Sequence, residues 1–175
     1  MNYGVIKPVD IANGPGVRVS LFVSGCTHHC PGCFNQEAWD FSFGKPFDEE
    51  AQQRVLEFLD HDFITGLTLL GGEPLEPENQ KGLLPFVQRV RRQLPQKTIW
   101  CYSGYDFEKD VLGWMMERLD TTGDLMDCID VLVDGRFIAA KKNISLRFRG
   151  SENQRVLDVK QSVKQKQAVW CEEFR

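Results

Sequence analysis

The chain has 175 residues, of which 42% are hydrophobic and 26% are charged, and its formal net charge is −4 at pH 7. This composition is typical of a globular protein, and the length predicts one domain with a continuous core. The small excess of acidic residues gives no electrostatic reason to expect a nucleic-acid partner.

The first predicted element is a strand at residues 17–23, which is rich in Val, Leu and Phe and runs directly into a loop of cysteines. Asp48 is the predicted N-cap of a first helix, in which apolar residues recur at helical spacing. Residues 67–70 predict a short buried strand that ends at Gly71-Gly72.

A second helix places apolar residues on one face from Leu83 to Leu94, and a proline within it leaves its start open. Residues 99–102 predict a third strand, and Asp106 caps a third helix. A fourth strand follows at residues 129–133.

Strands and helices thus alternate, which favours a parallel sheet with helical crossovers. Four strands are too few for the eight-stranded barrel, so we expect a single α/β domain folded as a partial (β/α) barrel with a mostly parallel sheet. Residues 156–175 are polar and predict a peripheral tail of unknown role, which leaves residues 1–155 as the domain.

The sequence gives no sign of a membrane or secretory protein. Its first residues lack the charged start and apolar run of a signal peptide, and no window approaches the roughly 18 apolar residues of a membrane span. We therefore expect a cytoplasmic protein. Because the cytosol keeps thiols reduced, its six cysteines point to metal or redox chemistry instead of disulfides.

Three of these cysteines, Cys26, Cys30 and Cys33, are spaced so that their thiolates can converge on one small object. A structural zinc or a conventional four-iron cluster is saturated by four ligands, whereas three leave one iron open for chemistry. The loop also follows the end of a predicted strand, where parallel α/β sheets place their sites. A zinc site with His28 or His29 as the fourth ligand is the alternative, and the spacing alone favours the cluster over it.

Several strings around the triplet carry a family resemblance. They are Asn13-Gly14-Pro15-Gly16, Ser24-Gly25-Cys26, Cys30-Pro31-Gly32-Cys33-Phe34-Asn35, Gly71-Gly72-Glu73-Pro74, Ser103-Gly104-Tyr105 and Leu132-Val133-Asp134-Gly135. With these strings the chain resembles the radical S-adenosylmethionine enzymes, and among them the activating enzymes of anaerobic ribonucleoside-triphosphate reductase. The resemblance reaches about residue 155, so that residues 1–155 are expected to form a radical S-adenosylmethionine domain.

The resemblance implies that Cys26, Cys30 and Cys33 hold a [4Fe-4S] cluster whose fourth iron binds S-adenosyl-L-methionine. Reductive cleavage of that cofactor to methionine and a 5′-deoxyadenosyl radical would generate a glycyl radical on the large subunit of the reductase. The cofactors carry this chemistry, so no side chain is expected to act as a catalytic acid or base. Gly32, Cys33, Phe34 and Gly72 are implied as contacts to S-adenosylmethionine, with Phe34 near the adenine.

A flavodoxin or ferredoxin is the electron donor that the resemblance implies. Two alternatives stay open: activation of another glycyl radical enzyme, such as pyruvate formate-lyase, and a non-catalytic zinc or electron-transfer module. The stoichiometry with the reductase and the cluster potential are not readable from the sequence. Cys101, Cys128 and Cys171 are interpreted as small apolar side chains or idle thiols.

Overall fold

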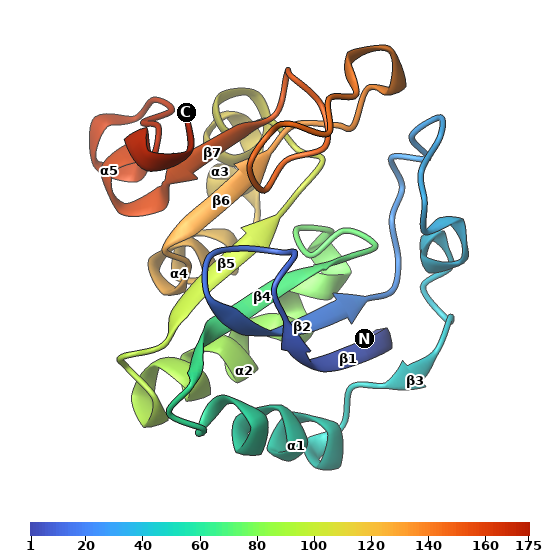
Figure 1. Ribbon diagram of the computed structural model, residues 1–175, viewed down its shortest axis with the longest axis vertical. Helices are drawn as coiled ribbons and strands as arrows, with labels where there is room; N and C mark the ends of the chain where they lie inside the picture. Colours follow the sequence, from blue (N-terminus) through green and yellow to red (C-terminus); the bar gives the residue numbers. More distant parts are fainter.

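One seven-stranded sheet forms the centre of the molecule in the computed structural model, which describes residues 1–175 (Figure 1). The strand order is β3-β1-β2-β4-β5-β6-β7. The strands are β1 (Asn2–Asp10), β2 (Val17–Val23), β3 (Lys45–Pro46), β4 (Ile64–Gly71), β5 (Thr98–Tyr102), β6 (Val131–Asp134) and β7 (Arg155–Asp158).

Helices connect the central strands and follow the last one. They are α1 (Glu49–Leu59), α2 (Pro77–Gln93), α3 (Met116–Arg118), α4 (Thr122–Cys128) and α5 (Val159–Gln165), together with a π-helical segment (Phe107–Met115) and short 3-10 turns (Gln36–Trp39, Ala139–Lys141, Glu172–Phe174). The predicted caps are confirmed: Asp48 accepts a hydrogen bond from the Ala51 N–H, and Asp106 accepts one from the Lys109 N–H. None of the helices has the length and apolar character that a membrane span requires.

The expectation of a partial barrel with a mostly parallel sheet is wrong. The four predicted strands do form a parallel centre, in which β2 pairs with β4, β4 with β5 and β5 with β6. However, β1 and β3 at one edge and β7 at the other pair antiparallel, so the sheet is mixed and stays open. These edge strands lack the continuous apolar runs that identify buried parallel strands.

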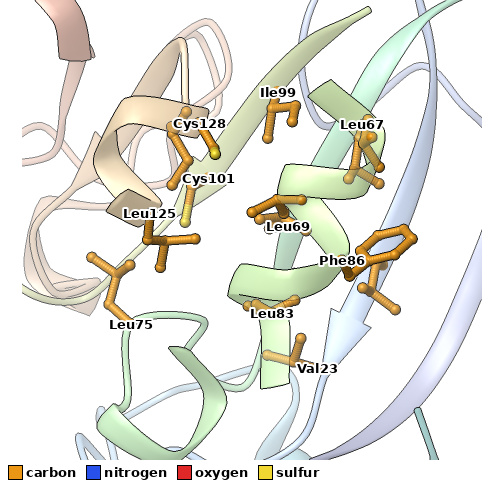
Figure 2. Close-up of a cluster of buried hydrophobic side chains, with 14 of the residues drawn as sticks. Val23, Leu67, Leu69, Leu75, Leu83, Phe86, Ile99, Cys101, Leu125 and Cys128 are labelled. Carbon is orange, nitrogen blue, oxygen red and sulfur yellow. The ribbon is translucent and has the colours of Figure 1, made fainter. Parts of the chain in front are cut away.

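The two faces of the sheet have different partners because side chains alternate along each strand. One face packs against the helices in a core of 30 buried residues. Figure 2 shows Leu83 and Phe86 of α2 beside Leu67 and Leu69 of β4. Cys101 and Cys128 belong to this core, which agrees with their interpretation as small apolar side chains.

The other face is covered by loops and by the end of the chain. The loop between β1 and β2 crosses β4, where the Thr68 hydroxyl donates to the Asn13 carbonyl oxygen at 2.8 Å (Figure 1). At the far edge Trp100, Val133, Val156 and Phe174 form a second buried cluster. The residues expected to be a peripheral tail thus include all of strand β7 except Arg155, together with the buried Phe174.

Candidate metal and cofactor site

The candidate site lies at the carboxyl ends of the parallel strands. The cysteine loop follows β2, Gly71-Gly72 ends β4, Ser103-Gly104 follows β5, and Gly135 follows β6. A cavity of about 520 Å³ is lined by residues from all four of these segments. Such a position is where open α/β sheets bind their ligands.

All three cysteines of the triplet line this cavity. Cys26 is buried, whereas Cys30 and Cys33 are partly exposed. The Cys33 N–H donates to the Cys30 carbonyl oxygen at 3.0 Å, which closes a tight turn. Gly32 in this turn has φ +77°, a conformation that favours glycine. The structure therefore brings the three sulfurs to the same cavity, with the Asn35 N–H donating to Cys33 Sγ at 3.5 Å.

The surroundings fit an iron–sulfur cluster better than a mononuclear zinc. A tetrahedral zinc with Zn–S bonds of about 2.3 Å holds its ligands about 3.8 Å apart, whereas the three sulfurs do not form such a close group. His28, one of the two candidate fourth ligands of a zinc, has its Nε2 3.0 Å from Glu73 Oε2. The His29 ring packs against the Trp39 ring in a tilted arrangement, at a centroid distance of 4.6 Å. Three thiols that line one cavity, with His28 held by Glu73, suit a cluster with one iron left open.

Burial controls the acidity of these thiols in the metal-free chain. Burial raises the pKa of Cys26 to about 12, and the nearby carboxylates of Glu73 and Glu76 also raise it. Burial also raises the pKa of Cys30, partly offset by Arg136. Because iron binds thiolates, loading the site must release protons from these two cysteines.

Glu73 connects the segments that surround the cavity. Its carboxylate is 1% exposed and accepts hydrogen bonds from the Ser103 hydroxyl at 2.9 Å and the Gly104 N–H at 2.7 Å. The Leu75 N–H donates to it at 2.8 Å, and His28 contacts it from the cysteine loop. One side chain thus joins the loops after β2, β4 and β5.

Two further polar residues hold the start of the cysteine loop. Glu76 accepts hydrogen bonds from both the backbone and the hydroxyl of Thr27. The Asn79 side-chain amide donates to the carbonyl oxygens of Ser24 and Gly25. Neither Glu76 nor Asn79 belongs to the site residues predicted from the sequence. Their only signal is a three-residue spacing with Glu73, which places them together at the start of α2.

Gly72 marks the closest approach of two backbones at the site. A Cβ atom at this position would lie 2.6 Å from the Gly25 carbonyl oxygen and 2.9 Å from that of Ala38. The Gly72 N–H donates to the Val23 carbonyl oxygen at 2.7 Å. Only glycine fits between these groups, and Gly72 also lines the cavity.

Phe34 lies at the rim of the cavity with 88% of its surface exposed. Ile144 on the opposite loop also lines the cavity and is 92% exposed. Apolar side chains this exposed are candidates for burial by a ligand or a partner. The contact between Phe34 and an adenine stays a prediction.

Polar residues outside the cysteine loop differ in whether they reach the cavity. Asn13 and Arg149 line it. Asp134 does not line it: its carboxylate is buried and paired with Arg155, and burial raises its pKa. Asp106, Glu108 and Asp134 form the one tight group of carboxylates, and Arg155 sits among them as their counter-ion.

Comparison with known proteins points to an iron–sulfur family. Residues 12–157 match the family model described as a 4Fe-4S single cluster domain. The chain is 47% identical over 157 residues to the anaerobic ribonucleoside-triphosphate reductase-activating protein of Haemophilus influenzae, covering 88% of this chain and 96% of that protein. Proteins of the same name from Escherichia coli K12 and phage T4 are 42% and 38% identical, over 88% and 89% of this chain and 96% and 93% of their own lengths.

Proposed function

The chain belongs to the family of anaerobic ribonucleoside-triphosphate reductase-activating proteins, and we propose that it activates such a reductase by generating a glycyl radical on it. The observation that carries the proposal is the single cavity lined by the three thiols, in which the nearby His28 is held by Glu73. The match to a 4Fe-4S cluster domain supports an iron–sulfur group in that cavity.

In this proposal Cys26, Cys30 and Cys33 hold the [4Fe-4S] cluster, and S-adenosylmethionine binds beside it against Gly32, Cys33, Phe34 and Gly72. When bound, the two groups supply the one-electron chemistry that splits S-adenosylmethionine and removes a hydrogen atom from a glycine of the reductase. The position of Gly32, Phe34 and Gly72 on the lining of the same cavity supports their assignment.

The protein itself would bind and orient the cluster and S-adenosylmethionine and would exclude water from the cavity. Gly72 lets its backbone approach a ligand without a side chain in the way. Glu73 fixes the loops around the cavity, which keeps the ligand-binding backbone in one arrangement. Trp39 lines the cavity, and its buried indole N–H has no partner within the protein, so it is available as a donor to a bound ligand.

The electron for this reaction comes, in our proposal, from a flavodoxin- or ferredoxin-type donor. We also propose a cytoplasmic location, which is supported by six cysteines without a disulfide, since the cytosol keeps thiols reduced. The net charge of −4 offers no attraction for nucleic acid.

Anaerobic reconstitution with iron and sulfide tests the metal. We expect about four irons per chain in the wild-type protein and in a Cys171→Ala control. The Cys30→Ala variant should lose the cluster, because two thiols remain. Stoichiometric zinc without visible absorbance would contradict the proposal and favour a zinc module.

Electron paramagnetic resonance tests the partner. The reduced protein, mixed with S-adenosylmethionine and the anaerobic reductase, should give a glycyl radical signal on the reductase and release methionine. No signal on the reductase, with a signal on pyruvate formate-lyase under the same conditions, would show that another glycyl radical enzyme is the substrate.

A further inference from the structure

Glu76 is a buried residue next to the cysteine loop. Its carboxylate has no part in the proposed reaction. The residue is 5% exposed and precedes α2. Its Oε1 accepts hydrogen bonds from the Thr27 N–H at 2.7 Å and from the Thr27 hydroxyl at 2.6 Å. Thr27 directly follows Cys26, which is a cluster ligand in the proposed function. The Glu76 carboxylate is therefore hydrogen-bonded to the residue next to that ligand.

The charge of Glu76 has no cationic partner. No Lys, Arg or His side chain lies within ion-pair distance of it, whereas the carboxylate of its neighbour Glu73 contacts His28 Nε2 at 3.0 Å. Its carboxylate accepts hydrogen bonds from both donors of Thr27 and lies at the N-terminal end of the 17-residue helix α2, where a negative charge is favourable. The geometry therefore places this carboxylate close to Cys26.

We propose that Glu76 is a positioning residue that fixes the backbone beside Cys26 and, through its charge, lowers the reduction potential of the cluster. The inference rests on the proposed function, in which Cys26 is a cluster ligand. Reduction adds one electron and therefore one negative charge to the cluster. A buried carboxylate nearby opposes that added charge, because charges interact more strongly in a protein interior than in water.

The geometry allows the charge to be removed without losing a hydrogen bond. Both Thr27 donors bond to Oε1, and Oε2 accepts none. A Glu76→Gln variant therefore keeps the acceptor and loses only the charge. Glu78→Gln is the matched control. Glu78 is exposed and lies in the first turn of α2, and its substitution changes the net charge by the same amount.

The experiment is a potentiometric titration of the reconstituted full-length protein with dithionite, in which the reduced cluster is followed by electron paramagnetic resonance. We expect Glu76→Gln to bind as much iron as wild type and to have a higher midpoint potential. At the wild-type midpoint its ratio of reduced to oxidised cluster should rise at least about threefold, which corresponds to about 28 mV at 59 mV per tenfold change. Glu78→Gln should titrate as wild type does.

A third variant separates positioning from charge. Glu76→Ala removes the acceptor as well, so it should retain less iron than Glu76→Gln on dilution into a chelator. Equal retention would contradict the positioning role.

Equal potentials for wild type and Glu76→Gln, with full clusters in both, overturn this inference and leave the proposed function intact. A Glu76→Gln protein that folds, as judged by circular dichroism, but takes up no cluster also contradicts it. Wild-type protein that binds no iron overturns the proposed function and this inference with it.

Discussion

The His28 Nε2 atom lies 3.0 Å from Glu73 Oε2, and the two side chains are 4% and 1% exposed. This buried contact joins the cysteine loop to the end of β4. The same carboxylate accepts hydrogen bonds from Ser103 and Gly104, at the end of β5. The three loops that surround the cavity are therefore held by one residue, and its removal should affect all of them.

We predict that Glu73→Ala lowers the free energy of unfolding of the apo protein by about 3 kcal/mol or more, because several buried donors lose their acceptor. Urea denaturation followed by circular dichroism measures this. The control is Glu78→Ala, an exposed residue of α2 whose loss should cost less than about 1 kcal/mol. Similar midpoints for the two variants would show that the Glu73 network does not stabilise the fold.

Gly72 gives a second prediction, based on the space around its Cα. A methyl group there meets two carbonyl oxygens at 2.6 and 2.9 Å, so Gly72→Ala must push the cysteine loop away. We expect a loss of about 1–3 kcal/mol in stability and weaker retention of iron.

Gly123 is the matched control for this change. It lies in α4, and a Cβ atom added there meets nothing within 4 Å. Gly123→Ala should therefore leave iron binding unchanged and stabilise the protein by about 0.5–1 kcal/mol. If the two alanine variants behave alike, the backbone contact between Gly72 and Gly25 has no structural importance.

The centre of the sheet and the cysteine loop were predictable because both have local signals. Apolar runs identify β2, β4 and β5, and ligand spacing identifies the triplet. Strand β1 escaped prediction because Gly4 and Pro8 interrupt its pattern and four of its nine residues are exposed. Proline near a register shift is tolerated at the sheet edge, which only the tertiary structure reveals.

The polar contacts around the site were not predictable for a different reason. Glu76 contacts Thr27 across 49 positions of sequence, and Asn79 contacts Ser24 across 55. At the start of a helix such residues look like ordinary caps and solvated side chains. Their burial follows from the packing of α2 against the cysteine loop, for which the sequence contains no local signal.

Asp10 gives a prediction of pH dependence. Its carboxylate accepts hydrogen bonds from the Ala12 N–H and the Asn13 amide, and so fixes the loop that lines the cavity. Burial raises the pKa of Asp10, but contacts with Ser20, Ala12 and Asn13 together lower it by more than burial raises it. The pKa therefore lies below its usual value. A lowered folded-state pKa means that the stabilisation is present above the unfolded-state pKa of about 3.9 and is lost as the pH falls through the folded-state value.

We therefore expect the free energy of unfolding to fall more steeply for wild type than for Asp10→Asn between about pH 5 and about pH 2. Urea denaturation at a series of pH values measures both slopes. Asp62→Asn, at an exposed position, should follow wild type. Parallel curves for wild type and Asp10→Asn would mean that the carboxylate is no more acidic in the folded state than in the unfolded chain.

The end of the chain gives the last prediction, because it reaches the far side of the cavity. The Phe174 ring packs edge-on against Trp100 and Phe148, with centroids 5.3 and 5.4 Å away. Phe148 lines the cavity and has φ +56°, an uncommon conformation for a bulky residue that its neighbours must support. The sequence predicted a polar tail here because one buried aromatic among polar residues carries no periodic pattern.

We expect Phe174→Ala to lower the free energy of unfolding by about 3 kcal/mol, as for other buried phenylalanines. It should also expose the cavity-lining loop to proteolysis, since Phe148 loses one of its two aromatic supports. Phe63→Ala, at a residue that is 59% exposed, should change stability by less than about 1 kcal/mol. A Phe174→Ala protein with unchanged stability and unchanged proteolysis of residues 137–150 would show that the end of the chain does not support the cavity. The predicted cost arises because Phe174 completes a buried aromatic cluster on the face of the sheet that no helix covers.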